Sequence, residues 1–196
     1  NQLISQPIKG TARRHTDQTH DVEEAFQLQR SKKERAENTM IVDLVRNDMS
    51  RIATKGSVEV KELCKVYPFV HVHQMISTVV AELQAETPVT DAIAACFPMG
   101  SMTGAPKVRA MQLIEQYEET KRGLYSGAVG YIDPNGDFDF NVVIRSLIYR
   151  KDIEYLSLQV GSALTANSNP ENEYDECLLK AKGVLDVLSQ KMTINL

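Results

Sequence analysis

The sequence predicts an α+β fold, in which helices and antiparallel strands occupy separate stretches of the chain. Apolar residues recur at helical spacing after Ser31, and a second helical pattern follows the Asn169-Pro170 dipeptide. Between them, two runs rich in β-branched and aromatic residues flank the turn sequence Asp133-Pro134-Asn135-Gly136. This order of elements argues against a doubly wound parallel sheet.

The helices are predicted from capping and periodicity, and the strands from composition. Ser31-Lys32-Lys33-Glu34 has the form of a capping box, and the proline after Asn169 marks the first residue of the last helix. The expected helices span residues 31–53, 72–83, 89–96, 106–118 and 170–191. The expected strands span residues 124–132, 138–149 and 153–164.

The composition is that of a globular domain with a core of its own, since 42% of the 196 residues are hydrophobic and 24% are charged. With a net charge of −4 and only short basic runs, the chain offers no footprint for nucleic acid. No apolar stretch approaches the roughly 18 residues that cross a bilayer. Cys64, Cys96 and Cys177 are odd in number, widely spaced and without the pairing of a metal site, which fits reduced thiols in an intracellular protein. We therefore expect a cytoplasmic protein that binds neither nucleic acid nor membrane.

A glycine-rich loop precedes the helix predicted at residues 106–118. Two glycines and two hydroxyl-bearing residues, Gly100, Ser101, Thr103 and Gly104, lead into Pro106. The free amides of a first helical turn, together with the helix dipole, favour a carboxylate or a phosphate. The local pattern alone is more often that of an ordinary loop and helix cap.

Paired carboxylates occur on two of the predicted helices. Glu34 and Glu37 are three residues apart on the apolar face of their helix, so they are predicted to point toward the core. Glu173 and Glu176 repeat this spacing on the last helix. Buried carboxylates are rare unless they are paired or bind a metal, and Mg²⁺ prefers oxygen ligands. A capping role for Glu34 and a solvated helix start for the second pair remain alternatives.

Lys9 stands between Ile8 and Gly10, where a ligand or another backbone can approach closely. A lysine in such a place becomes a nucleophile when desolvation or a neighbouring cation keeps it neutral. The alternative is a solvated lysine at the end of a strand, because lysines are mostly exposed.

Taken together and in this order, four motifs resemble those of the chorismate-utilising enzymes. They are Pro7 to Thr11, Glu34 to Glu37 running on to Asp48, Gly100 to Lys107, and Asn172 to Glu176. The family includes anthranilate, aminodeoxychorismate, isochorismate and salicylate synthases. The resemblance implies the family's layered α/β/β/α sandwich of antiparallel sheets with outer helices. It matches residues 1–196 to the carboxy-terminal portion of a single chorismate-binding domain, and we expect the upstream portion to lie outside this sequence.

The resemblance also implies a role for each candidate residue. Lys9 matches the lysine of the aminodeoxychorismate synthases, where anthranilate synthases typically have alanine, and is expected to attack ring carbon C2 of chorismate as the C4 hydroxyl leaves. Glu37 and Glu176 match the Mg²⁺ ligands, with Glu34 and Glu173 beside them. The positions around chorismate are matched by Gly100, Ser101, Thr103, Gly104, Tyr125, Arg145, Gly161 and Lys180.

Within the family, the resemblance is closest to the aminodeoxychorismate synthases, which form 4-amino-4-deoxychorismate from chorismate and ammonia for p-aminobenzoate and folate synthesis. A glutamine amidotransferase subunit is expected to deliver the ammonia, because no cysteine here lies in the setting of a glutaminase nucleophile. Anthranilate synthase component I and an isochorismate or salicylate synthase are alternatives, as is a fragment that only binds metal or a partner. Gln74, Ala163 and Asn167 depart from the family pattern.

Overall fold

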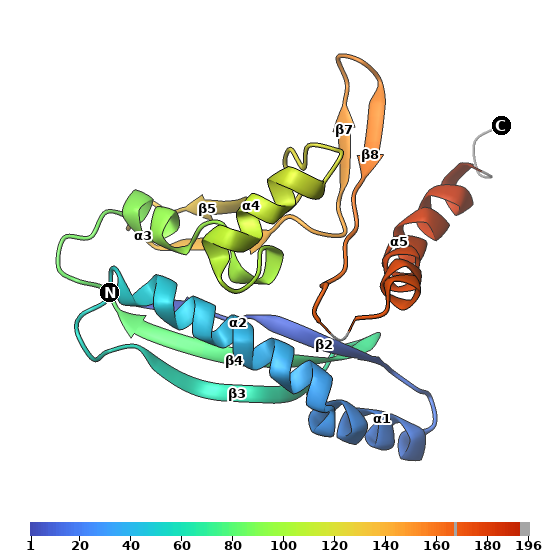
Figure 1. Cartoon of the computed structure of the whole chain (residues 1–196), viewed down its shortest axis with the longest axis horizontal. Helices are drawn as coiled ribbons and strands as arrows, with labels where there is room; N and C mark the ends of the chain where they lie inside the picture. The colour runs from blue at the N-terminus through green and yellow to red at the C-terminus, as the bar shows by residue number, and fades with distance from the viewer. Residues whose placement is uncertain (167, 193–196) are drawn as a thin grey trace. The chain divides into compact units, whose positions relative to one another are not determined.

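The computed structural model describes the backbone of residues 1–166 and 168–192 (Figure 1). These residues form two compact units, Asn1–Glu119 and Thr120–Leu196. Every strand pair among the described residues is antiparallel, and the helices lie in separate stretches of the chain. The predicted α+β class is confirmed. Asn167 lies outside the described residues.

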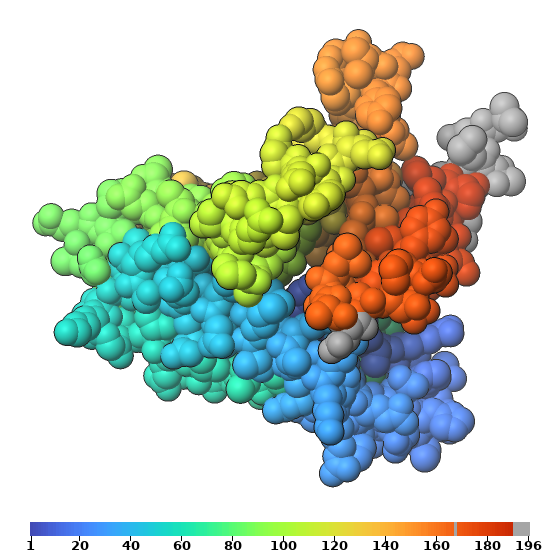
Figure 2. Space-filling view, in the orientation of Figure 1, coloured from blue at the N-terminus to red at the C-terminus, as the bar shows by residue number. Residues whose placement is uncertain are grey.

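The first unit is built on a four-stranded sheet with β4 (Val72–Glu82) as its central strand. β1 (Gln2–Ser5) and β2 (Ile8–Arg13) follow one another along one edge of β4, and β3 (Glu59–Pro68) pairs with the other edge. Two helices, α1 (Gln18–Arg30) and α2 (Lys32–Ser50), lie along one face of this sheet (Figure 1). Their side chains form a continuous surface, drawn in blue to cyan in Figure 2.

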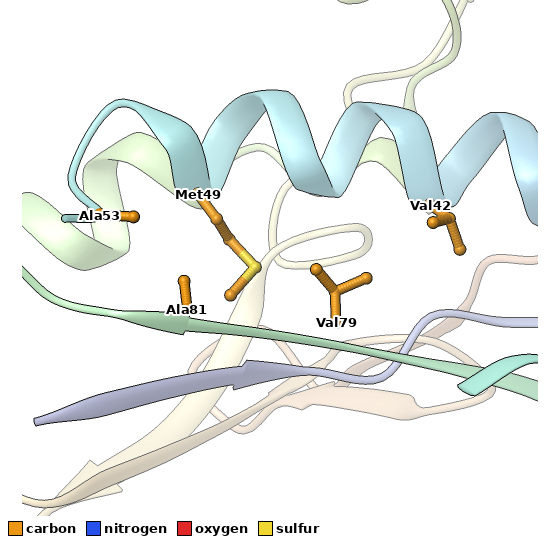
Figure 3. Close-up of a cluster of buried hydrophobic side chains, with 5 residues drawn as sticks. All are labelled: Val42, Met49, Ala53, Val79 and Ala81. Atoms are coloured by element: carbon orange, nitrogen blue, oxygen red, sulfur yellow. The ribbon is translucent and has the colours of Figure 1, made fainter. Parts of the chain in front are cut away.

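The core of the first unit lies between α2 and β4. Val42 and Met49 from α2, with Ala53 just beyond it, point toward Val79 and Ala81 of β4 (Figure 3). Side chains alternate along a strand, so the odd-numbered residues of β4 face the helix. This packing fixes α2 lengthwise along the central strand.

The start of α2 has the predicted Ser31 cap, while the Ser31 N–H donates to the Leu28 carbonyl oxygen at 3.2 Å. The Ser31 hydroxyl accepts a hydrogen bond from the backbone N–H of Glu34 at 3.3 Å. The helix predicted at residues 31–53 is confirmed, although it ends at Ser50. The predictions at residues 89–96 and 106–118 are also confirmed, as α3 (Val89–Cys96) and α4 (Lys107–Tyr117).

The helix predicted at residues 72–83 is wrong, because this stretch is the strand β4. The apolar residues Val72, Met75, Ile76, Val79 and Val80 recur at the i, i+3, i+4, i+7 and i+8 spacing of an amphipathic helix, with polar residues between them. In the folded chain this stretch is paired along both edges and largely buried on both faces, so its apolar residues do not alternate with a period of two. α1 and β3 were not predicted: α1 buries Leu28 alone, and register shifts interrupt the alternation of β3.

The second unit contains two hairpins and a long helix. β5 (Ala128–Ile132) pairs with β6 (Phe138–Val142), and β7 (Leu147–Arg150) pairs with β8 (Tyr155–Leu158). The predicted turn is confirmed: the Asp133 carboxylate accepts hydrogen bonds from the N–H groups of Asn135 and Asp137 at 2.8 and 3.0 Å. The last predicted helix is α5 (Pro170–Met192).

All three expected strands are too long. The run predicted at residues 138–149 is interrupted at 143–146, and the run predicted at 153–164 is a strand only over β8. The expected strand at residues 124–132 begins only at Ala128, because Ser126 has a φ of 67° that no extended strand adopts. None of the described helices has both the length and the apolar character that a membrane crossing requires.

Asp21 of α1 contacts polar groups of β4 and of the segment between β2 and α1. Its carboxylate accepts hydrogen bonds from the His15 backbone N–H at 2.8 Å and from Arg14 Nε at 2.9 Å, and its Oδ1 lies 3.0 Å from His73 Nε2. The His15 amide first, and then the Arg14 guanidinium, hold the pKa of Asp21 far below its ordinary value of 3.8. The ionised carboxylate therefore helps to tie α1 to the sheet.

The contacts of Asp21 predict that the free energy of unfolding decreases at acid pH. A carboxylate whose pKa is lowered by folding stabilises the protein above its unfolded-state pKa, near 3.9, and loses that contribution as the pH falls. We expect the difference in free energy of unfolding between wild type and Asp21→Asn to be constant above about pH 5 and to shrink between about pH 4 and pH 2. Urea denaturation across this range measures it, with Asp43→Asn as an exposed control on α2. A difference that does not change with pH contradicts the account.

Candidate active site

Lys9 and Gly10 form a β-bulge in β2. Ile8 pairs with Ile76 and Thr11 with Gln74, so these two residues lie opposite the single residue Met75 of β4. Gly10 has a φ of +97°, which glycine adopts without strain. A bulge bends its strand and changes the direction of its side chains, and bulges are common beside active sites. Lys9 is half-buried, and its side chain starts from the bulge and not from a regular position in the strand.

α2 runs past this bulge and places polar groups against it. A Cβ built on Gly10 would lie 3.1 Å from Glu34 Oε2, so the glycine lets the Glu34 carboxylate approach the backbone beside Lys9. Asn38, one turn further along α2, donates from Nδ2 to the Lys9 carbonyl oxygen at 3.5 Å. Glu34 and Glu37 are half-buried, less buried than the sequence predicted. The structure therefore brings Lys9 and Glu34 together in one unit.

The glycine-rich loop is anchored on α2 at both ends. Gly100 is buried, and a Cβ built on it would lie 3.0 Å from the Leu44 Cβ of α2. Lys107, the first residue of α4, forms an ion pair with Asp48 of α2, and these side chains are only 13% and 4% exposed. A buried ion pair of this kind fixes the position of the helix start.

The helix that follows the glycine-rich loop, α4, begins one residue later than predicted. Pro106 is the residue before the first turn, and Lys107 is the first helical residue. Gly100–Met102 forms a short 3-10 turn, and the Thr103 hydroxyl donates to the Met99 carbonyl oxygen at 3.2 Å. Ser101 and Gly104 are half-buried, and the anion-binding role of the loop stays a prediction.

Four predicted residues of the second unit lie close together: Glu176 and Lys180 on α5, and Tyr125 and Gly161 from the chain before it. A Cβ built on Gly161 would lie 2.7 Å from the Tyr125 hydroxyl, so a larger residue at this position would require the tyrosine to shift. Lys180 donates from Nζ to the Gly161 carbonyl oxygen at 3.0 Å and lies 2.6 Å from Glu176 Oε1. The cluster brings a phenol, an ammonium and a carboxylate close to Gly161, a combination that can bind a polar, charged substrate.

Glu173 is buried, with 7% of its surface exposed, so the alternative of a solvated helix start is wrong for this residue. The Ser162 hydroxyl donates a hydrogen bond to its carboxylate. The N-terminal end of α5 also favours a negative charge there.

Arg145, expected on a strand, lies in a bend between β6 and β7 with a φ of 50° and is exposed.

The predicted metal ligands are divided between the two units, with Glu34 and Glu37 on α2 and Glu173 and Glu176 on α5. Each helix contributes two carboxylates three residues apart, and this donor set fits Mg²⁺, which binds one or two carboxylates together with water or substrate oxygens. In the part of the chain that the structure describes, no group of three or more His, Cys, Asp and Glu side chains is arranged to hold a metal. The magnesium site stays a prediction.

Residues 1–186 match the family model of the chorismate binding enzymes. The chain belongs to this family. It is 43% identical over 188 residues to anthranilate synthase component 1 of Mycolicibacterium smegmatis, covering 96% of this chain and 36% of that protein. It is 45% identical over 186 residues to the aminodeoxychorismate synthase of Streptomyces pristinaespiralis, covering 95% of this chain and 26% of that protein.

The fold of this chorismate binding enzyme chain is also that of solved relatives. The crystal structure of anthranilate synthase component I from Streptococcus pneumoniae superimposes with a TM-score of 0.81 at 36% identity, covering 92% of this chain and 39% of that chain. The chain therefore spans between about a quarter and two fifths of the length of these relatives. The family resemblance read from the motifs is confirmed.

Sequence reasoning missed several residues that hold this site together. Asn38, Asp48 and Ser162 each contact a predicted site residue or the loop that carries one. Asn38 had a usable signal, since it lies on α2 one turn after Glu34 and is followed by the core residues Ile41 and Val42. The partners of Asp48 and Ser162 become visible only in the folded chain.

Proposed function

We propose that this chain is part of an aminodeoxychorismate synthase component I, which converts chorismate and ammonia to 4-amino-4-deoxychorismate in the cytoplasm for p-aminobenzoate and folate synthesis. The observation that carries the proposal is the place of Lys9, in a bulge beside the Glu34 carboxylate. The family resemblance associates lysine at this position with aminodeoxychorismate synthases and alanine with anthranilate synthases.

The proposed reaction consists of two displacements on the ring. Lys9 Nζ, in its neutral form, bonds to C2 of chorismate while the ring double bonds shift, and the C4 hydroxyl takes up a proton and leaves as water. Ammonia then bonds to C4, the double bonds shift back, and the bond between C2 and the lysine nitrogen breaks. The sum is chorismate and ammonia giving 4-amino-4-deoxychorismate and water, with Lys9 regenerated.

The other site residues bind and orient the substrate in this proposal. Glu37 and Glu176, with Glu34 and Glu173 beside them, would hold Mg²⁺, whose chemistry when bound is to neutralise a substrate carboxylate and withdraw charge from the ring. Hydrogen-bond donors and cations suit a substrate with two carboxylates. We assign that role to Ser101 and Thr103 with the amides of Gly100 and Gly104, and to Tyr125, Arg145, Lys180 and the backbone of Gly161.

The ammonia is proposed to come from a glutamine amidotransferase subunit. The three cysteines of the chain are free thiols, and Cys64 is buried beneath α2, where it contacts Thr39 and the Arg35 carbonyl oxygen. A buried thiol among such contacts packs as a small apolar group and does not serve as a glutaminase nucleophile. Cys64 therefore does not supply a glutaminase nucleophile, which fits the proposed delivery of ammonia by a glutamine amidotransferase partner.

Anthranilate synthase component I is the second candidate, because the chain is nearly as similar to the mycobacterial anthranilate synthase as to the Streptomyces aminodeoxychorismate synthase, at 43% and 45% identity. Product analysis separates the two. The full-length gene product is incubated with chorismate, Mg²⁺ and ammonium, and the products are identified by liquid chromatography with mass spectrometry. We expect 4-amino-4-deoxychorismate. Anthranilate or isochorismate as the sole product rejects the proposal, and absence of any turnover favours a chain that only binds.

A further inference from the structure

Both strands that flank β4 here, β2 and β3, contain a bulge, and the two bulges lie opposite nearby residues of β4. On β2, Lys9 and Gly10 lie opposite Met75, and on β3 the register slips opposite Ser77. At the second bulge Cys64 has a φ of 54°, and its N–H donates to the Ser77 side-chain oxygen at 2.8 Å. A bulge removes bonds from the ladder, so the backbone groups there need other partners.

One side chain of α2 contacts both bulges. Asn38 is fully buried, and its Nδ2 donates to the carbonyl oxygens of Met75 at 3.3 Å and Lys9 at 3.5 Å. Its Oδ1 accepts a hydrogen bond from the Ser77 hydroxyl, which in turn accepts the Cys64 N–H. The NH₂ group of this amide therefore binds the β2 bulge, and its carbonyl oxygen is linked to the β3 bulge through the Ser77 hydroxyl.

We infer that Asn38 is a positioning residue for Lys9. By binding the Lys9 carbonyl oxygen it fixes the plane of the peptide that follows, and with it the direction in which the lysine side chain leaves the strand. The Ser77 hydroxyl prevents the amide from turning over, because a turned amide would place its NH₂ group where an acceptor is required. This inference rests on the proposed nucleophilic role of Lys9, and Asn38 acts through the backbone without touching the substrate.

The test compares two variants of the full-length gene product that remove similar bonds at different places. Asn38→Ala removes the link to the β2 bulge. Gln29→Ala removes a comparable bridge from α1, because Gln29 donates to the Cys64 carbonyl oxygen at 2.8 Å and accepts from the Val66 N–H at 3.2 Å, both on β3. Amide hydrogen exchange of the peptide spanning residues 7–11 and the rate of adduct formation on Lys9 with chorismate are measured by mass spectrometry.

We expect exchange within residues 7–11 to be at least about tenfold faster in Asn38→Ala, and the rate of Lys9 adduct formation to fall about 10- to 100-fold with unchanged affinity for chorismate. Gln29→Ala should leave both quantities within about twofold of wild type while lowering the thermal midpoint. Equal effects of the two variants, or an unchanged bulge in Asn38→Ala, would overturn the inference.

A second variant covers the case in which Asn38→Ala does not fold. Ser77→Ala keeps the Asn38 side chain and removes the hydroxyl that orients it, so we expect a change in the same direction, by about three- to tenfold, at residues 7–11. No change in a folded Ser77→Ala counts against the inference. If wild type forms no Lys9 adduct, the nucleophilic role fails on its own, and hydrogen exchange alone decides whether Asn38 holds the bulge.

Discussion

Replacing Lys9 with alanine is expected to abolish formation of 4-amino-4-deoxychorismate while leaving the first unit folded. Removing the nucleophile of a covalent mechanism closes the two-step route, and comparable losses in other enzymes are at least on the order of 10³-fold in kcat. Lys9 lies in a bulge outside the hydrophobic clusters of the unit, so we expect the free energy of unfolding to change by less than about 0.5 kcal/mol. Steady-state product formation and urea denaturation of the same preparation measure both quantities.

Lys55→Ala is the matched control for this variant, because Lys55 is an exposed lysine in the turn between α2 and β3. It should retain wild-type activity and stability. A Lys9→Ala variant that keeps more than about a tenth of the wild-type rate shows that the lysine is not the nucleophile. Unfolding of Lys9→Ala would instead assign a structural role to the side chain.

Lys107→Met is expected to be strongly destabilising, because it leaves the Asp48 carboxylate buried without its close partner. Asp48 is 4% exposed on its side chain, and the next cation, Arg51, lies 3.9 Å away at the protein surface. Breaking one side of a buried ion pair costs about 3 kcal/mol in free energy of unfolding. The start of α4 and the glycine-rich loop depend on this pair, so we also expect a raised KM for chorismate.

Two further variants separate this explanation from a general effect of lost charge. Arg46→Met breaks the exposed pair with Asp43 on the same helix and should cost less than about 0.5 kcal/mol. The double variant Lys107→Met with Asp48→Leu replaces both charges by apolar groups of similar size and should recover most of the lost stability. If the double variant is as unstable as Lys107→Met alone, the uncompensated charge is not the cause.

The parts of the fold that could be predicted are those with local signals. The Ser31 cap and the apolar spacing after it defined α2, and Asp133 with its turn residues defined the hairpin of β5 and β6. β4 was mistaken for a helix because its place at the centre of the sheet, which buries both of its faces, depends on strands distant in the sequence. Local patterns carry no information about such pairing.

In the candidate site, too, the residues with local motifs could be predicted and their long-range contacts could not. Lys9, Glu34 and Gly161 could be named from motifs, and the structure adds what lies against each of them. The bulge that carries Lys9 depends on the register between β2 and β4, and Asn38 reaches it from α2 only because the helix packs along that strand. Register and packing are long-range properties, so neither the bulge nor its partner could be read from the order of residues.

The most direct test of the account is mass spectrometry of the full-length gene product after incubation with chorismate and Mg²⁺ while ammonia is withheld. We expect the peptide containing Lys9 to gain the mass of chorismate less one water, and we expect added ammonium to remove this adduct as 4-amino-4-deoxychorismate appears. An adduct on another residue, or a protein that makes the product without ever modifying Lys9, would contradict it.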